Sequence, residues 1–154
     1  MASYSATIQW TRRGERFVDN RYSRAHVWRF DGGLEVPASS SPHVVPPPLS
    51  TENAVDPEEA FVASLSSCHM LWFLSLAAGR GFVVDSYIDE AAGRMTRAGD
   101  GKLSFEQVEL RPSVVFADGA APTSEELLEL HHLAHEECFI ARSVRCAVVC
   151  RPST

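Results

Sequence analysis

Alternating apolar and polar residues predict two strands near the start of the chain. From Tyr4 to Trp10 every second residue is apolar, which is the period of a strand with one buried face. A second alternating run extends from Tyr22 to Phe30, is rich in aromatic and β-branched residues, and ends at a turn sequence, residues 31–33. The two runs are suited to pair as antiparallel neighbours.

Prolines interrupt this pattern over residues 35–56. Five prolines lie in the segment, three of them consecutive at positions 46–48, and serines surround them. Because consecutive prolines fit neither a helix interior nor a central strand, the segment is predicted to be a long, stiff loop. A loop of this length can cover a functional site or act as a surface spacer, and the sequence leaves both open.

The first predicted helix begins at Pro57. Asp56 is a suitable cap, proline is favoured at the first helical position, and two acids follow in the first turn. The helix is expected to end at Gly79 or Gly81. Residues 60–78 carry no formal charge and are long enough to span a bilayer. The serines among them favour a helix buried at the centre of a domain or dimer instead.

Strand patterns return in the second half of the chain. Residues 82–97 and 102–116 are predicted to be strands joined by a turn at 98–101, and Pro112 indicates an edge or a bulge. The apolar residues expected on one face of the second strand are Val108, Leu110, Val114 and Phe116.

A second helix is predicted to open at Thr123, where Thr123 and Glu126 fit a capping box. Its apolar stripe is expected to comprise Leu127, Leu130, Ala134, Cys138 and Ala141. Residues 146–150 are predicted to be a short closing strand. This order of elements predicts an α+β fold in which antiparallel sheet packs on helices.

Composition narrows the class of protein. A chain of 154 residues that is 45% hydrophobic can bury a core, so a single domain over residues 1–154 is expected. The formal net charge of −6 argues against nucleic acid and anionic membranes as partners. The first residues lack the pattern of a secretory signal, so a cytoplasmic, reducing location is expected. The four cysteines are too few and too unevenly spaced for a disulfide framework, which leaves catalysis, metal binding or packing.

Two short motifs contain the two helical cysteines. Residues 56–68 read DPEEAFVASLSSC, with a spacing of ten from Glu58 to Cys68, and His135 precedes Cys138 by three residues. The first motif resembles the segment leading to the reactive cysteine of the OsmC/Ohr family, the osmotically induced and organic hydroperoxide resistance proteins. The second is similar to that family's signature near the end of the last long helix.

The resemblance implies an OsmC-like intertwined homodimer with two central helices and Cys68 beside Cys138. It also implies a two-cysteine peroxidase in oxidative stress defence. Cys68 would attack the peroxide and become a sulfenic acid, and Cys138 would condense with it to a disulfide. The expected substrate is an organic hydroperoxide, with hydrogen peroxide possible, and the expected reductant is a dithiol or a lipoyl-type protein. No cofactor and no metal are expected.

Two further residues are assigned catalytic roles through the resemblance. Family members pair an arginine with the glutamate that matches Glu58, but prolines stand where some relatives have that arginine. Arg24 is the first substitute because it shares a strand face with aromatic residues, and Arg13 and Arg16 stay open. Glu58 lies about 15 Å along the helix from Cys68, so it is expected to position the arginine or complete the partner subunit's site. His69 and His135 are further candidates for tuning the thiols.

A zinc site is the main alternative function. His131, His135 and Cys138 are spaced to share one helical face and could bind zinc together with Cys68 or His69. A small-ligand-binding dimer without peroxidase activity is also open. Cys146 and Cys150 are expected to serve packing, because in an extended strand their α-carbons lie about 13 Å apart, too far for a disulfide.

Overall fold

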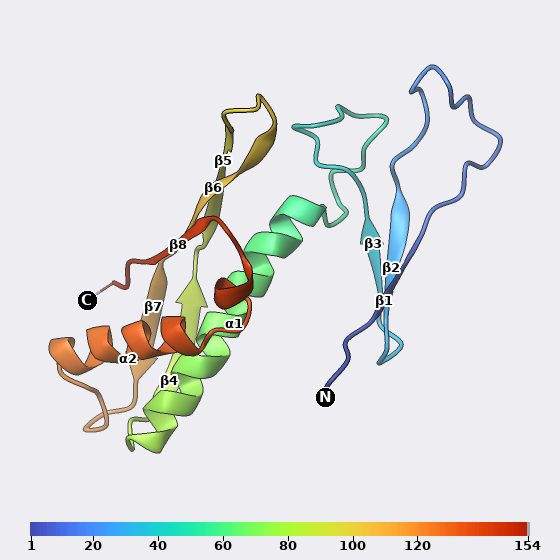
Figure 1. The fold of residues 1–154 in the computed structure, drawn as a ribbon. Helices are drawn as coiled ribbons and strands as arrows, with labels where there is room; N and C mark the ends of the chain where they lie inside the picture. Colours follow the sequence, from blue (N-terminus) through green and yellow to red (C-terminus); the bar gives the residue numbers. More distant parts are fainter. Residues whose placement is uncertain (154) are drawn as a thin grey trace. The chain divides into compact units, whose positions relative to one another are not determined.

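The computed structural model describes residues 1–153, and their contacts divide the chain into two compact units, Met1–Ala60 and the part from Phe61 onward. Figure 1 shows a mixed α+β arrangement in which runs of strands are separated by two long helices. The single domain over residues 1–154 stays a prediction. In chain order the elements are β1 (Ala6–Gln9), β2 (His26–Phe30), β3 (Glu35–Ala38), α1 (Pro57–Gly79), β4 (Val84–Asp89), β5 (Ala92–Arg97), β6 (Leu103–Leu110), β7 (Pro112–Phe116), α2 (Ser124–Glu137), the short 3-10 helix η1 (Ala141–Ser143) and β8 (Ala147–Cys150).

The first unit contains a three-stranded antiparallel sheet in the order β1–β2–β3. The predicted pairing of the first two strands is confirmed, with Ile8 opposite Trp28. The prediction that residues 35–56 are entirely loop is wrong at its start, where β3 contains Pro37. Proline is tolerated there because β3 lies at the edge of the sheet.

The second unit contains two sheets, β4–β7 and β5–β6–β8. Each long strand predicted in this region is divided, because β4 and β7 pair in one sheet while β5 and β6 pair in the other. The apolar residues of 108–116 that were expected on one face therefore belong to two different sheets. Val108 and Leu110 belong to one hydrophobic cluster, and Val114 and Phe116 pack against another. Pro112 begins β7 at the edge of the two-stranded sheet, as expected.

One strand pair departs from the predicted antiparallel arrangement. β8 runs parallel to β6, with Val148 opposite Val108 and Cys150 opposite Leu110. A parallel neighbour needs a long crossover, and β7, α2 and η1 supply it. The prediction of purely antiparallel sheets is therefore wrong for this pair, while the α+β fold class is confirmed.

Helix α1 has the predicted start and one of the two predicted ends. The Glu59 backbone N–H donates to Asp56 Oδ1 at 2.8 Å, so Asp56 caps the helix. Residues spaced by four form its buried face: Leu65, His69, Phe73 and Ala77. By length and composition α1 could cross a membrane, a test that the core helices of soluble proteins also pass.

Helix α2 begins with the predicted capping box and ends earlier than predicted. The Thr123 side chain accepts from the Glu126 N–H, and Glu126 accepts from the Thr123 N–H. Cys138 is the C-cap residue, with an extended backbone at ψ 108°, and Ala141 belongs to η1. Cys138 and Ala141 are therefore not part of the α2 stripe, because the chain leaves the helix after Glu137.

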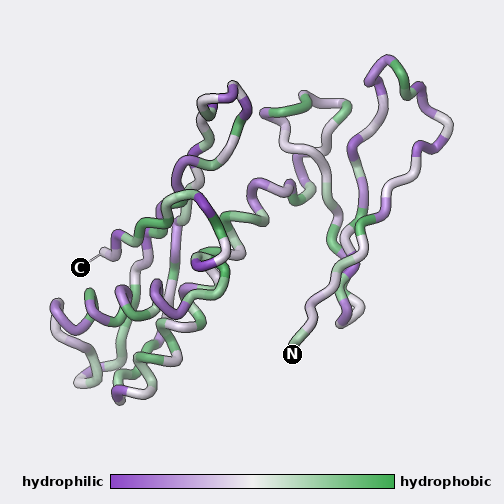
Figure 2. The backbone as a smooth tube through the Cα atoms, in the orientation of Figure 1, coloured by the Kyte–Doolittle hydropathy of each residue, from purple (hydrophilic) through white to green (hydrophobic). Residues whose placement is uncertain are grey.

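Two hydrophobic clusters share α1. One joins Phe73 and Ala77 of α1 to Leu130 and Ala134 of α2 over the β4–β7 sheet. The other joins Leu65 of α1 to the β5–β6–β8 sheet. Figure 2 shows α1 mainly in hydrophobic colours, whereas α2 alternates between hydrophilic and hydrophobic ones, as expected for a helix with one buried face.

Candidate functional site

Cys68 and Cys138 lie side by side in the second unit. The Cys68 thiol lies near enough to the Cys138 thiol to affect its pKa, and both cysteines are reduced. Cys138 is 1% exposed, and its Sγ accepts from the Ala141 N–H at 3.4 Å. Burial raises the pKa of the Cys138 thiol to about 11, and the neighbouring Cys68 contributes to this rise. At neutral pH the Cys138 thiol is therefore protonated.

A groove opens beside Cys68. Its volume is about 560 Å³, and it is lined by Ser64, Ser67, Cys68, Leu71, Trp72, Ser75, Phe139 and Ile140. The Trp72 and Phe139 rings meet edge to face, with centroids 5.5 Å apart. Leu71 and Phe139 are 60% and 64% exposed, so the wall beside the thiol is apolar and open to a ligand or to another chain.

Arg24 and Glu58 both belong to the first unit. The Arg24 guanidinium lies 3.7 Å from the centroid of the Tyr22 ring, and its Nη1 donates to the carbonyl oxygens of Asn20 and Tyr22. Glu58 is half-buried, and its Oε2 has no hydrogen-bond partner within residues 1–153. The catalytic roles assigned to Arg24 and Glu58 stay predictions, as do those of the alternatives Arg13 and Arg16.

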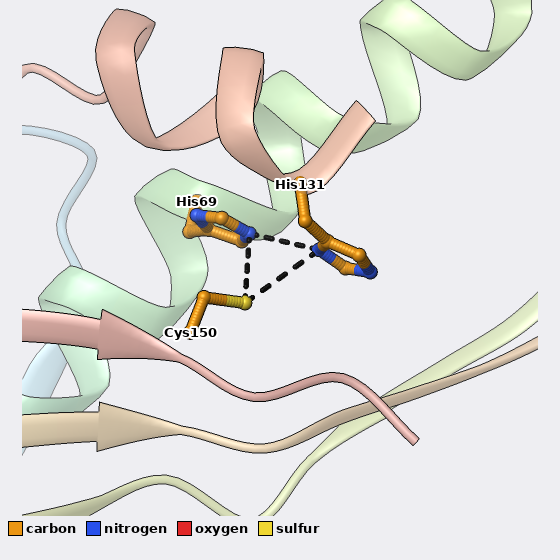
Figure 3. A group of neighbouring side chains, drawn as sticks. All are labelled: His69, His131 and Cys150. Carbon is orange, nitrogen blue, oxygen red and sulfur yellow. Dashed lines mark hydrogen bonds between the residues drawn. The ribbon is translucent and has the colours of Figure 1, made fainter. Parts of the chain in front are cut away.

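A second group of polar side chains lies in the core, where His69, His131 and Cys150 meet (Figure 3). His69 Nε2 lies 3.1 Å from His131 Nδ1, and Cys150 Sγ lies 3.7 Å from each of these nitrogens. The planes of the two imidazole rings are nearly parallel, with an interplanar angle of 5°. Both histidines are buried, so the group is largely screened from solvent.

This group differs from the zinc ligands proposed as an alternative from the sequence. Within residues 1–153 it is the one set of histidine, cysteine and acidic side chains that could hold a metal ion, and it includes neither His135 nor Cys138. His131 and His69 lie together in this group, while its third member is Cys150, which was expected to serve packing. Local spacing could not reveal it, because the parallel pairing of β8 places Cys150 there.

The electrostatics of this group follow from burial. Desolvation is the largest cause that lowers the pKa of His69 and of His131, each to about 4, so both rings are neutral at pH 7. Burial, followed by the charge of Asp89, raises the pKa of Cys150 to about 12. Asp89 is held by the Ser66 hydroxyl at 2.5 Å and by the Arg111 N–H at 2.6 Å, so a fixed carboxylate lies near the group.

These observations define an α+β protein with two neighbouring thiols beside an apolar groove. Comparisons with known proteins identify its family. The model of the OsmC-like protein family matches residues 50–153. This chain therefore belongs to the OsmC-like family. No curated protein matches the chain significantly.

Solved structures support the same fold. An OsmC-like protein of unknown function from Vibrio cholerae is 55% identical, with a TM-score of 0.97 over 99% of this chain and 100% of that one. An organic hydroperoxide resistance protein OsmC from Legionella pneumophila is 15% identical, with a TM-score of 0.74 over 100% and 98% of the two chains. The organic hydroperoxide resistance protein OhrB of Bacillus subtilis is 18% identical, with a TM-score of 0.69 over 99% and 98%. The similarity to the Legionella pneumophila and Bacillus subtilis structures shows a common fold only.

Proposed function

We propose that this protein is a two-cysteine peroxidase that reduces organic hydroperoxides in the cytoplasm as part of oxidative stress defence. The observation that carries the proposal is the contact between the Cys68 and Cys138 thiols beside an apolar groove. The OsmC-like family membership supports it, and so do the names of two structural relatives, which are organic hydroperoxide resistance proteins.

The reaction follows from the chemistry of the two thiols. The Cys68 thiolate attacks the distal peroxide oxygen, the O–O bond breaks, and the alkoxide leaves as an alcohol after taking a proton. Cys68 is then a sulfenic acid. The Cys138 sulfur attacks the Cys68 sulfur, a disulfide forms, and water leaves. A dithiol or lipoyl-type reductant restores both thiols by exchange and is itself oxidised to a disulfide.

The lining of the groove favours an organic substrate. Leu71, Trp72, Phe139 and Ile140 offer apolar contacts to the organic group of a hydroperoxide, which hydrogen peroxide lacks. The same exposed residues, Leu71 and Phe139, are suited to contact a second copy of the chain, and the homodimer is part of the proposal. In that dimer the groove would be narrowed by the partner subunit.

Peroxide consumption by the purified, reduced protein tests this function. Cumene hydroperoxide and hydrogen peroxide are supplied with a dithiol reductant to wild type, Cys68→Ser and Cys138→Ser, and Cys146→Ser is the matched control. The expected result is turnover in wild type and the control, preference for cumene hydroperoxide, and loss of turnover in Cys68→Ser. Peptide mapping of oxidised wild type is expected to find a disulfide between Cys68 and Cys138. Absence of both turnover and this disulfide would contradict the proposal.

A further inference from the structure

Three ligand atoms from three separate elements converge in the core. His69 comes from α1, His131 from α2 and Cys150 from the end of β8, and Figure 3 shows their side chains directed toward a common point. Buried polar groups are usually matched to a hydrogen-bond partner or to a metal ion. The distances between the three atoms, the protons that the rings and the thiol carry, and the nearby negative charge decide between these two explanations.

The distances fit a tetrahedral zinc ion. Zinc binds histidine nitrogen at about 2.0–2.1 Å and thiolate sulfur at about 2.3 Å, so two such nitrogens lie about 3.3 Å apart and nitrogen and sulfur about 3.6 Å apart. The corresponding separations in this cluster are 3.1 Å between the two nitrogens and 3.7 Å from each nitrogen to the sulfur. The three atoms thus already occupy three corners of a tetrahedral site.

A hydrogen-bond network explains the same cluster less well. When both rings are neutral, one inward nitrogen donates and the other accepts through its single lone pair. The Cys150 thiol can then only share that lone pair or accept weakly from the same N–H. The outer nitrogens, His69 Nδ1 and His131 Nε2, have no partner within residues 1–153 under either explanation. A metal ion would accept all three inward lone pairs at once.

The local charge also favours a divalent cation. Asp89 lies close enough to Cys150 and His69 for its negative charge to act on both. In the absence of a cation this carboxylate opposes a thiolate at Cys150. A zinc ion carries two positive charges, and the Cys150 thiolate together with Asp89 would balance them. On binding, the ion would replace the thiol proton, which would leave to solvent.

We propose that His69, His131 and Cys150 form a zinc site with three protein ligands. The site joins α1, α2 and β8 at the junction of the two hydrophobic clusters, and it would fix the helix that carries Cys68. Cys68 and Cys138 are not ligands, so the site is separate from the proposed peroxidase chemistry and does not depend on it. It also differs from a zinc site built on His135 and Cys138.

Cobalt binding to the metal-free, reduced full-length protein tests the ligands. Wild type is expected to bind one Co²⁺ with a thiolate-to-cobalt charge-transfer band and intense tetrahedral d–d bands, and Zn²⁺ is expected to displace it. Cys150→Ser should lose the charge-transfer band and weaken zinc binding by at least about 100-fold, since even indirect supporting residues contribute about 10–100-fold. Cys146→Ser and Cys138→Ser are the matched controls and should retain the band. Absence of the band in wild type, or its persistence in Cys150→Ser, would overturn the proposal.

Thiol labelling of wild type tests the site without any substitution. Protein with and without one equivalent of Zn²⁺ is treated with an alkylating reagent, and each cysteine is followed by peptide mapping. Zinc is expected to slow the labelling of Cys150 at least about tenfold by holding its sulfur on the metal, while Cys146 labels at the same rate. The melting temperature should rise with Zn²⁺ and return on chelation. Equal labelling of Cys150 in both samples would overturn the proposal.

Discussion

The Cys68 thiol is a neighbour of the Cys138 thiol and affects its pKa, although one comes from the middle of α1 and the other from the residue that ends α2. The position of Cys138 outside the helix matters for this contact. Its backbone is extended, and η1 follows at Ala141–Ser143, so the thiol is presented at the end of the helix. Such a position suits a residue that must approach Cys68 more closely to form a disulfide.

Removal of the resolving thiol is expected to trap the first oxidised species. In Cys138→Ser, one equivalent of cumene hydroperoxide should convert Cys68 to a sulfenic acid that persists, because no neighbouring thiol can condense with it. A dimedone adduct on the Cys68 peptide, detected by mass spectrometry, measures it. Wild type should give a disulfide and little adduct under the same conditions. An unmodified Cys68 after peroxide treatment would argue against its role as the attacking thiol.

The sequence could predict the elements that depend on local pattern. The cap at Asp56 and the capping box at Thr123 follow from short-range side-chain to backbone bonds, and the structure contains both. The contact of Cys68 with Cys138 was expected only through the family resemblance, since seventy residues separate them. Helix periodicity alone placed Cys138 within α2, because a stripe of apolar residues cannot show where the backbone leaves the helix.

The sequence pattern could not predict which strands pair when they lie far apart in the chain. The pattern of residues 82–116 indicated one long hairpin, but nothing local showed that its halves join different sheets. The position of Cys150 depends on parallel pairing of β8 with β6, which forms only after the crossover has folded. For the same reason the cluster of His69, His131 and Cys150 could not be predicted from spacing, which indicated a shared face only for His131, His135 and Cys138.

The resolving step is expected to depend on pH. Burial raises the pKa of Cys138 to about 11, so its thiolate fraction at pH 7 is small. As long as the pH stays below the pKa, this fraction increases about tenfold for each unit by which the pH is raised. The rate of disulfide formation should therefore rise from pH 7 to pH 10. Acid quenching after one equivalent of peroxide, followed by mass spectrometry, measures it. Sulfenic acid formation in Cys138→Ser serves as the control for effects of pH on the first step, and a flat profile for disulfide formation would contradict the prediction.

Burial on α2 predicts a large difference between two leucines of the same helix. Leu130 is fully buried against Phe73 and Ala77, whereas Leu128 is 51% exposed. Leu130→Ala is expected to lower the free energy of unfolding by about 2–5 kcal/mol because it leaves a cavity. Leu128→Ala, the matched control, should change it by about 0.5 kcal/mol or less. Urea denaturation followed by circular dichroism measures both, and similar values for the two would contradict this packing.

Close approach of β5 to α1 predicts that Gly93 tolerates no side chain. A Cβ atom at Gly93 would lie 2.5 Å from Phe105 Cε1 and 2.7 Å from Val62 Cγ2, both closer than real contacts allow. Gly93→Ala is therefore expected to destabilise the protein by about 1–3 kcal/mol through overpacking. Gly99→Ala is the control, because nothing lies within 4 Å of its Cβ position. Denaturant unfolding that shows no difference between the two variants would contradict the predicted clash.

Substitution of Glu58 tests whether this residue supports the Cys68 thiolate by positioning an arginine. Its Oε2 is buried and unpaired within residues 1–153, which leaves it available for a cation. Glu58→Gln keeps the shape and removes the charge, and it is expected to lower turnover about tenfold or more, because a hydrogen bond between charged groups contributes about 1.5–3 kcal/mol. Glu59→Gln is the matched control, since glutamine can replace glutamate in the capping box with Asp56.

The arginine that pairs with Glu58 can be identified by the same measurement of turnover. If Arg24 supplies the cation, Arg24→Lys should lower turnover and move the pH–rate profile to higher pH, because lysine cannot reproduce the paired donors of a guanidinium. Arg29→Lys is the control, since Arg29 already pairs with Glu35 on the exposed face of β2. The double variant of Glu58 and Arg24 should be no slower than the slower single variant if the two residues act as a pair. Additive losses would show that Glu58 and Arg24 act independently. An unchanged rate in Glu58→Gln would show that Glu58 acts only as a helix-terminal acid.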